Sequence, residues 1–492
     1  MLVKNKHSIP SHWAWAMHKE ISAINPKLPC HDLIEESEVS FLPMACVEEV
    51  SGRYNLKHIK KYCEVKKGYT SFINGDVIFA KITPCMENGK IAVLDNLVNG
   101  IGYGSTEFHV SRSKSFIENK YLFYFFVQTA FRKDAQNNMT GSAGQLRVST
   151  IFFKSVLIPI PPFPEQQAIV AKLEQLFSEL DNGIACLKKA QEQLKVYRQA
   201  VLKQAFEGEL TKAWREQQTS LPSAQELLET INTERVQAIK LQGKKLKPVI
   251  PLTQADLNDM SELPDGWTWL KLGELTLGVE YGTSTKSLDN GDVPVIRMGN
   301  IQQGRIEWSN LAYTNDKADI SKYRLTKGDV LFNRTNSPEL VGKTAIYHGE
   351  MPAIFAGYLI RINQITALLE CKYLNFWLNS HPAKVYGNSV KTDGVNQSNI
   401  NGEKLKSYPL PYCSLQEQSQ IVQEIETRLS VCDNMEATIK QSLEKAEALR
   451  QSILKKAFEG KLLSEEELQI TRNAPDWEPA EKLLERIRAQ RL

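Results

Sequence analysis

Cationic, hydroxyl and amide side chains follow equivalent apolar runs in two parts of the sequence. The segment GDVIF at 75–79 is followed by Lys81 and Thr83, and GDVLF at 328–332 is followed by Arg334, Thr335 and Asn336. Each loop places a cation and uncharged donors just beyond a predicted strand, which suits phosphate anchoring and hydrogen bonding to base edges. The pattern therefore predicts two nucleic-acid contact loops, one in each half of the chain.

Two more pairs of segments extend this prediction. A glycine precedes Lys90 in the first half and Lys343 in the second. Small polar residues surround Gln145 and Arg147, and again surround Gln397, Ser398 and Asn399, where backbone N–H groups could cradle phosphates. The alternative is that Gly-Asp and Gly-Lys pairs only form tight turns. We favour the turn for Gly75-Asp76 and Gly328-Asp329, and nucleic-acid contact for the loops of Lys81 and Arg334.

The sequence contains no motif for catalysis that we recognise. LVGKT at 340–344 resembles the end of a phosphate loop, but the required earlier glycine would fall at Ser337. GxSxG, HExxH and a paired-carboxylate nuclease pattern are absent. The irregular spacing of His7, His12 and His18 favours surface or core histidines over a metal site. We therefore expect a binding protein without catalytic, cofactor or metal residues.

An internal repeat organises the elements that must position these loops. Residues 165–211 match 417–463 at a constant offset of 252, with 20 of 47 positions identical and AFEG shared at 205–208 and 457–460. Upstream, Pro10, Trp13 and Trp15 match Pro264, Trp267 and Trp269 at offset 254. Each half is thus predicted to be a globular domain followed by a long helix and a shorter one.

The long segments have apolar residues at heptad spacing. The seam runs through 169, 173, 176, 180, 184, 187, 194, 201 and 205 in the first segment, and through 421, 425, 429, 432, 439, 443, 446, 453 and 457 in the second. Helices are predicted over about 165–207 and 417–459, with shorter helices over about 223–241 and at the C-terminus. Pairing of the two seams with each other is favoured over separate helical bundles.

The globular parts contain short β-type runs separated by Gly, Asn and Pro, with one helix predicted near 118–133 and one near 370–386. The fold class is therefore α+β, with two pseudo-symmetric domains separated by two long antiparallel, coiled-coil-like helices. We expect a ligand with two local sites at a fixed separation, and duplex DNA meets that condition.

Composition limits the class of protein and bears on the DNA interpretation. The 492 residues have 60 Lys+Arg against 57 Asp+Glu, and the eight cysteines include no CxxC pair, so we expect reduced thiols. The longest apolar run, 121–127, is far shorter than the roughly 20 residues of a membrane helix, and we expect a cytoplasmic protein. Residues 1–164 have a net charge of +5 (19 Lys+Arg, 14 Asp+Glu), but 256–416 have −1 (16 against 17). The second domain therefore needs locally clustered cations or a basic partner.

The proline-rich junctions with EQ and IV (159–170 and 409–422), each followed by a long helix and an AFEG end, resemble the specificity subunit of type I restriction–modification enzymes. STEFHV at 105–110 and Gly144-Gln145 also look like motifs of that family's target-recognition domains, which adds Ser105 and Thr106 to the candidate contacts. The second domain has AGYL at 356–359 in place of STEF, which fits a different half-site.

The resemblance implies target-recognition domains at 1–160 and 256–410, which recognise an asymmetric bipartite DNA sequence. It implies helical spacers at 161–255 and 411–492 that bind two modification subunits, and recruitment of restriction subunits. Methyl transfer from S-adenosylmethionine, and the ATP and Mg²⁺ chemistry, would then lie in those partners. The runner-up is a protein–protein scaffold with two globular arms. A free-standing nuclease or methyltransferase is disfavoured by the missing motifs.

Overall fold

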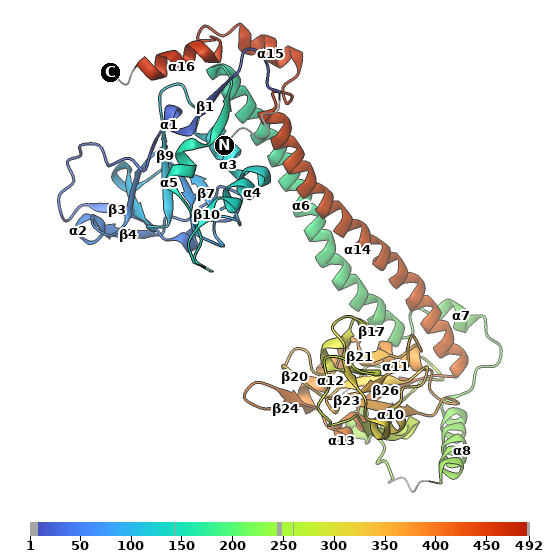
Figure 1. Ribbon diagram of the computed structural model, residues 1–492. Coiled ribbons are helices and arrows are strands. Elements are labelled where there is room, and N and C mark those ends of the chain that lie inside the picture. The colour runs from blue at the N-terminus through green and yellow to red at the C-terminus, as the bar shows by residue number, and fades with distance from the viewer. Residues whose placement is uncertain (1–7, 143, 244–247, 259, 490–492) are drawn as a thin grey trace. The chain divides into compact units, whose positions relative to one another are not determined.

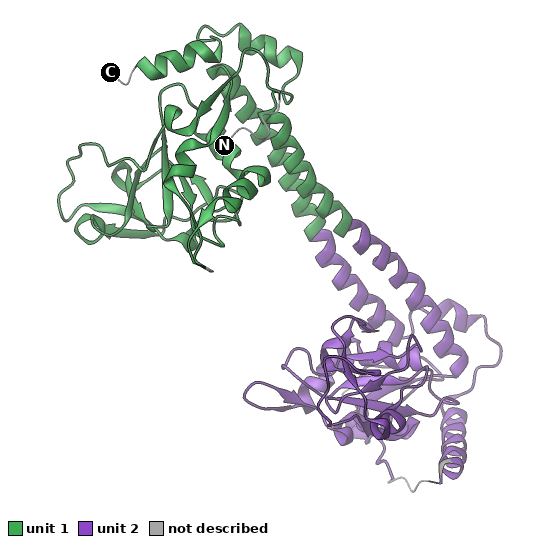
Figure 2. Ribbon diagram, in the orientation of Figure 1, with its two compact units in different colours: residues 1–188, 440–492 green, residues 189–439 purple. Residues whose placement is uncertain are grey.

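The computed structural model of the chain describes residues 8–142, 144–243, 248–258 and 260–489 (Figure 1). The chain forms two units, which Figure 2 shows in different colours. Unit 1 contains residues 1–188 and 440–492, and unit 2 contains residues 189–439. Each unit therefore combines one globular domain with one half of each long helix.

The globular domain of unit 1 is built on two four-stranded sheets, with strand orders β2-β9-β6-β7 and β4-β3-β8-β5. Most pairings are antiparallel, whereas β3 and β8 are parallel. The pairs β1·β12 and β10·β11 complete its strands. The strand bounds are β1 Ala14–Met17, β2 Ser22–Ile24, β3 Glu38–Leu42, β4 His58–Lys61, β5 Thr70–Ile73, β6 Val77–Ala80, β7 Ile91–Val93, β8 Ile101–Gly104, β9 Phe108–Ser113, β10 Met139–Thr140, β11 Arg147–Val148 and β12 Leu157–Ile160.

The core of unit 1 is completed by residues from the far end of the sequence. Leu454, Phe458 and Leu483 belong to the same buried cluster as Trp13 and Tyr121 of the N-terminal domain. The ring centroids of Phe458 and Tyr121 are 4.9 Å apart. The helices of this unit are α1 His18–Ile21, α2 Tyr62–Val65, α3 Asn119–Val127, α4 Thr129–Asn137, α5 Thr150–Ser155, α15 Glu465–Arg472 and α16 Ala480–Ala489, with parts of the long helices α6 Phe163–Phe206 and α14 Leu415–Phe458.

Unit 2 has a six-stranded sheet of order β14-β23-β19-β21-β17-β16, flanked by two three-stranded sheets, β18-β15-β22 and β20-β25-β24. The pairs β15·β22 and β17·β21 are parallel, and β13 pairs with β26. The strand bounds are β13 Thr268–Lys271, β14 Thr276–Tyr281, β15 Val293–Ile296, β16 Ile301–Gln302, β17 Gly304–Ile306, β18 Ala312–Thr314, β19 Val330–Asn333, β20 Thr335–Asn336, β21 Thr344–Ile346, β22 Ile354–Phe355, β23 Leu359–Gln364, β24 Thr392–Asp393, β25 Ser398–Asn399 and β26 Pro409–Tyr412. This composition confirms the α+β class with mostly antiparallel strands.

The core of unit 2 matches that of unit 1 at equivalent positions of the repeat. Phe206, which is equivalent to Phe458, lies 5.2 Å from Tyr373 and 5.0 Å from Trp377 between ring centroids. Leu227 and Ile231 of α8 join the same cluster. The helices of this unit are α7 Lys212–Glu216, α8 Ala224–Gln242, α9 Gln254–Asn258, α10 Lys317–Tyr323, α11 Cys371–Leu378, α12 His381–Val390 and α13 Gly402–Lys406, with the remaining parts of α6 and α14.

The long helices pack against each other within each unit and run antiparallel. In unit 1, Asp181 of α6 pairs with Arg450 of α14, and in unit 2, Arg198 of α6 pairs with Asp433 of α14. All nine predicted seam positions of each helix are buried or partly buried. The predicted pairing of the two seams is therefore confirmed.

The single helices predicted near 118–133 and 370–386 are wrong in one respect, because each is two helices. Gln128, with φ −56° and ψ 133°, leaves the helical conformation and separates α3 from α4. In unit 2, Ser380 caps the N-terminus of α12 and Pro382 lies in its first turn, so α11 ends before them. The apolar spacing alone did not show these breaks.

Candidate nucleic-acid interface

In unit 1 the candidate residues converge where β6 ends. The backbone N–H of Lys81 donates to Glu107 O at 2.9 Å, and the N–H of Val148 donates to Lys81 O at 2.8 Å. The N–H of Thr83 donates to Leu146 O at 3.0 Å. These bonds join the end of β6, the 105–107 turn and the β10–β11 hairpin. The structure therefore brings together Lys81, Thr83, Ser105, Thr106, Gln145 and Arg147, which we call surface 1.

Arg147 is not a free cation on surface 1. Its Nε lies 2.9 Å from Glu107 Oε2 and its Nη2 lies 2.9 Å from Glu107 Oε1, which is a bidentate ion pair. The hydrogen bonds from Arg147 hold the pKa of Glu107 below its ordinary value. Thr106 and Gln145 are exposed beside this pair. Arg147 therefore stays a predicted DNA contact, and its guanidinium also holds a carboxylate that no spacing rule placed there.

Lys90 has its side-chain partners outside surface 1, although its backbone carbonyl accepts from the N–H of Ala80. Its ammonium donates to the carbonyls of Val47 at 2.9 Å and Met44 at 3.2 Å, and its side chain is only partly exposed. The side chain therefore holds the turn after β3 in place. This contact explains why Lys90 does not point toward the loops with which the sequence grouped it.

In unit 2 the candidates gather around the three-stranded sheet β20-β25-β24, whose β24 end projects from the domain in Figure 1. Asn399 Nδ2 donates to Thr335 Oγ1 at 2.7 Å, and the N–H of Ile400 donates to Arg334 O at 2.9 Å. Ser398 is buried and bonds to Asp393, whereas Gln397 is exposed. These contacts bring together Arg334, Thr335, Asn336, Gln397, Ser398 and Asn399, which we call surface 2.

Arg334 is oriented by an aromatic ring and a carbonyl. Its guanidinium lies 4.9 Å from the centroid of Tyr281, and its Nη1 donates to Gly357 O at 3.2 Å. Its backbone N–H donates to Tyr358 O at 3.0 Å. Tyr358 is exposed. Sequence reasoning named neither tyrosine as a contact, because Tyr281 and Tyr358 lie 53 and 24 residues from Arg334.

The two surfaces share one backbone frame. Lys81 to Glu107 in unit 1 corresponds to Arg334 to Tyr358 in unit 2, and Val148 to Lys81 corresponds to Ile400 to Arg334. The side chains on that frame differ, with a Glu107–Arg147 ion pair in unit 1 and an exposed tyrosine beside Arg334 in unit 2. Equivalent positions therefore present different hydrogen-bonding groups.

Lys343 lies outside surface 2, in a cleft of about 900 Å³ between the domain and the helix pair of unit 2. Its ammonium donates to Gln302 Oε1 at 3.1 Å, and burial lowers the pKa of this lysine.

The glycines before Asp76 and Asp329 have φ values of +86° and +96°. Asp76 pairs with Arg112 and Asp329 with Arg361, which agrees with the turn interpretation of both Gly-Asp pairs.

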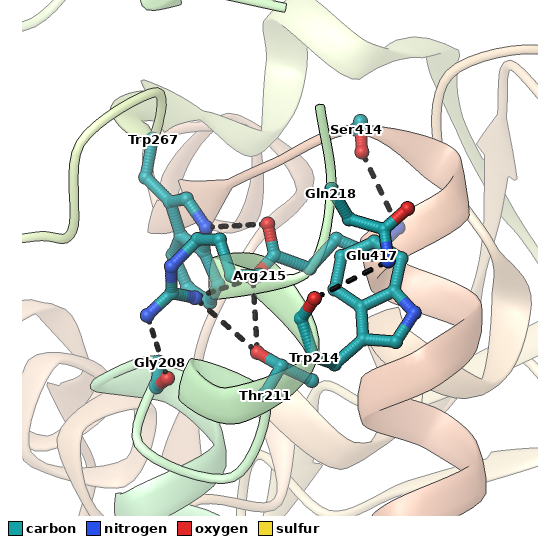
Figure 3. A network of polar contacts seen from close by, with 8 residues as sticks. All are labelled: Gly208, Thr211, Trp214, Arg215, Gln218, Trp267, Ser414 and Glu417. Atoms are coloured by element: carbon teal, nitrogen blue, oxygen red, sulfur yellow. Dashed lines mark hydrogen bonds and ion pairs between the residues drawn. The ribbon is translucent and has the colours of Figure 1, made fainter. Parts of the chain in front are cut away.

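The EQ residues of the junctions attach each domain to its helix. In unit 2, Glu417 accepts hydrogen bonds from Trp267 Nε1 and Thr211 Oγ1, each at 2.9 Å, and pairs with Arg215, as Figure 3 shows. In unit 1, the equivalent Glu165 accepts a hydrogen bond from Trp13 Nε1 at 2.9 Å and lies 2.9 Å from His12 Nε2. These buried carboxylates with aromatic donors are structural.

The neighbouring glutamines and the AFEG glycines complete the attachment. Gln166 bonds to the backbone of Glu118 and Pro161, and Gln418 bonds to that of Glu370 and Cys413. A Cβ at Gly208 would lie 2.4 Å from Pro264 Cγ, and a Cβ at Gly460 would lie 2.4 Å from Pro10 Cγ. Both glycines also have positive φ, so each helix end requires glycine for close packing on the domain.

Two of the three N-terminal histidines have structural contacts. His12 bonds to Glu165, and His18 is fully buried between Ser111 and the carbonyl of Phe153. His7 lies outside the described residues.

Among the helices in the described ranges, none is long and apolar enough to cross a membrane.

A family model described as the type I restriction modification DNA specificity domain matches residues 19–189 and 264–445. These two matches cover most of the chain and one lies in each globular domain with its helix, so the chain belongs to this family. It is a non-catalytic DNA-recognition subunit of a type I restriction–modification system, and catalysis lies in the partner subunits. Two domains of this family in one chain fit a bipartite target, and this assignment replaces the scaffold alternative.

Curated specificity subunits match nearly the whole chain. The EcoAI specificity subunit of Escherichia coli is 30% identical over 484 residues, which cover 88% of this chain and 80% of the relative. The EcoEI specificity subunit of Escherichia coli is 30% identical over 483 residues, with the same coverage. The EcoKI specificity subunit of Escherichia coli K12 is 25% identical over 388 residues, which cover 78% of this chain and 74% of the relative.

Solved structures share the fold. A chain from a study of complex assembly and conformational transition in the type I R-M system has a TM-score of 0.68 at 19% identity, over 93% of this chain and 100% of that chain. The HsdS subunit from Thermoanaerobacter tengcongensis has a TM-score of 0.54 at 19% identity, over 93% of this chain and 99% of that chain.

Proposed function

We propose that surface 1 and surface 2 each contact one half of an asymmetric bipartite DNA sequence. The observation that supports this proposal best is the shared backbone frame with different side chains at Lys81 and Arg334. A common frame positions both surfaces in the same way on their own domains. Different side chains on it would recognise different bases, so the two half-sites differ.

Surface 1 offers an ammonium at Lys81, a hydroxyl at Thr106 and an amide at Gln145, beside the Glu107–Arg147 ion pair. Surface 2 offers a guanidinium at Arg334 and amides at Asn336 and Gln397. Arg pairs with guanine and Asn or Gln pairs with adenine through two hydrogen bonds each. Lysine, serine and threonine also contact phosphates, as arginine and the amides do. Both surfaces therefore combine anchoring groups with groups that distinguish bases.

An exchange of domains tests this division of labour. Replacing residues 1–155 by the same domain of another specificity subunit should change one half of the methylated sequence and leave the other half unchanged. The replacement must retain the residues that face Phe458, because the C-terminal helices complete this core. A change in both halves, or in neither, would contradict the assignment of one half-site to each domain.

We also propose that two modification subunits dock on the helix pair, one on each unit. Tyr197 and Leu449 occupy equivalent positions of the repeat, and their side chains are 45% and 50% exposed on α6 and α14. A few large side chains that an interface buries, tyrosine among the most frequent, often provide much of the binding energy. S-adenosylmethionine, ATP and Mg²⁺ would be bound in the partner subunits, in the cytoplasm.

Native mass spectrometry of the assembled complex tests the stoichiometry. Tyr197→Ala and Leu449→Ala should each weaken the binding of one modification subunit about tenfold or more, which corresponds to at least ~1.4 kcal/mol. The control is Val236→Ala, which removes an equally exposed apolar side chain from α8. If neither variant loses a modification subunit, these two positions are not docking sites.

A further inference from the structure

The cleft of unit 2 contains more cations than its carboxylates neutralise. It is lined by Lys195, Arg198, Arg305, Lys343, Lys372 and Lys384, and by only three carboxylates, those of Glu426, Asp433 and Glu436. Arg198 and Arg305 pair with Asp433, and Lys372 pairs with Glu426. Within the described part of the chain, Lys343 and Lys384 have no carboxylate partner. The cleft thus holds a local positive charge in a domain whose net charge is negative.

The two unpaired lysines lie close enough to affect each other. Burial, and then the charge of Lys343, lowers the pKa of Lys384, and burial lowers that of Lys343. Both ammonium groups would therefore gain from an anion in the cleft. Uncharged amides lie among them, namely Gln191, Gln199, Gln302 and Gln303. Asn375 and Asn379 also line the cleft, but their Nδ2 groups donate to Gly304 O and Thr344 Oγ1 within the domain. Cations interspersed with amides are typical of contacts to the sugar-phosphate backbone.

The equivalent position in unit 1 is filled. Tyr124 and Phe177, equivalent to Phe376 and Leu429 of the cleft, lie 5.7 Å apart between ring centroids, and Arg450 lies 4.6 Å from the Phe177 ring. Arg132, equivalent to Lys384, donates to the carbonyls of Glu87 and Val127. Phe123 replaces Asn375 and is buried. In unit 1, Lys90, the equivalent of Lys343, is held by the carbonyls of Val47 and Met44, and an arginine stands in place of Lys384.

The cleft begins next to surface 2. The N–H of Asn333 donates to Lys343 O at 2.8 Å, and the N–H of Gly342 donates to Asn333 O at 2.8 Å, one residue before Arg334. We propose that the cleft binds phosphates of the DNA backbone beside the half-site of unit 2, within the gap between the half-sites. This inference rests on the proposed function and adds a backbone contact in one unit only. It also accounts for how a domain of net charge −1 binds DNA.

An acidic segment of a partner protein is the alternative occupant, and the cleft favours it less. The cleft lining is dominated by cations and amides, whereas protein interfaces are enriched in aromatic residues, Met and Arg at their centres. If DNA occupies the cleft, loss of its lysines weakens DNA binding. If an acidic protein segment occupies it, the same loss weakens assembly of the subunits.

The test uses the full chain assembled with its modification subunits and a duplex that contains its target, identified from the methylated sequence of the host. The variant Lys343→Gln/Lys384→Gln should weaken binding, and the slope of log Kd against log [KCl] should fall by up to about 2, because each phosphate contact contributes ~0.9. Selectivity between correct and altered half-sites should not change. The matched control is Lys240→Gln/Lys317→Gln, which removes two exposed lysines of unit 2 outside the cleft.

A second measurement uses the unmodified protein, so it does not depend on the folding of a variant. Neutral methylphosphonate groups placed one at a time along the gap should weaken binding at one or two positions near the half-site of unit 2. In the double variant the same substitutions should have little effect.

The outcomes separate the two proposals. An unchanged salt slope with normal target selectivity overturns the cleft contact and leaves the proposed function standing. Weaker assembly with an unchanged slope assigns the cleft to an acidic protein segment, which also overturns the inference. If the unmodified complex does not distinguish its target from a scrambled duplex, the proposed function fails as well.

Discussion

Arg198 and Asp433 form an ion pair across the two long helices of unit 2, with Nη2 of the arginine 2.6 Å from Oδ1 of the aspartate. Arg450 and Asp181, their equivalents in the repeat, form the corresponding pair in unit 1. The two pairs are separated by 17 residues along both helices, between 181 and 198 and between 433 and 450. The same antiparallel register is therefore present in both units, and the sequence repeat specifies it twice.

The two ion pairs should differ in their contribution to stability. Asp433 also accepts from Arg305 at 2.9 Å and is less exposed than Asp181. We expect Asp433→Asn to lower the free energy of unfolding by on the order of 1 kcal/mol, and Asp181→Asn to lower it by less. Urea unfolding of both variants measures the difference. An equal or larger effect of Asp181→Asn would contradict the assignment of Asp433 as the more strongly held group.

Two buried histidines should make unit 1 sensitive to acid. Burial is the main cause that lowers the pKa of His18 to about 3 and that of His109 to about 4, from 6.5. Because the unfolded chain binds protons that the folded chain does not, stability is fully present above about pH 6.5. It falls as the pH drops toward 4, by up to ~1.4 kcal/mol per pH unit for each histidine.

The pH dependence of unfolding measures this effect. His18→Gln should reduce the loss of stability between pH 7 and pH 5, even if the variant is less stable at both. His58→Gln, which replaces an exposed histidine, should not change the pH dependence. Equal pH dependence in the wild type and in His18→Gln would refute the assignment of His18 as a buried neutral group.

Arg334→Gln should weaken DNA binding, since the substitution removes the one guanidinium that surface 2 holds against Tyr281 and Gly357. If Arg334 contacts a phosphate, the salt slope should fall by about 1 for every sequence, and if it contacts a base, selectivity at one position should relax. Arg334→Lys separates charge from geometry, because lysine keeps the charge and loses the paired donors. Unaltered affinity across the whole salt series would remove Arg334 from the contacts.

Shortening both helices by one heptad should shorten the gap in the target. Removing 188–194 from α6 together with 437–443 from α14 keeps the apolar seam of each helix. It also keeps the ion pairs Arg198–Asp433 and Arg450–Asp181. A heptad spans ~10 Å of helix, so the gap should shrink by up to about 3 base pairs. The methylated motif of the deleted form provides the measurement. An altered half-site with an unchanged gap would contradict the model of two arms on a helical spacer.

The elements that repeat were predictable, whereas the contacts made between them were not. Helix α6 runs from Phe163 to Phe206, within two residues of the predicted 165–207, because the heptad seam and the glycine after its end, Gly208, define it locally. The Glu107–Arg147 pair joins positions 40 residues apart and depends on how a turn meets a hairpin, which spacing does not encode. Lys90 and Lys343 are equivalent in sequence, yet the first meets the carbonyls of the turn after β3 and the second faces Gln302.

Sequencing of the methylated bases in a host genome tests the central claim most directly. The host should be examined with this gene and its neighbours present, and then with this gene alone deleted. We predict one asymmetric bipartite methylated motif that disappears on deletion and returns on complementation. Persistence of every bipartite methylated motif after the deletion would contradict the conclusion that this chain selects the DNA sequence.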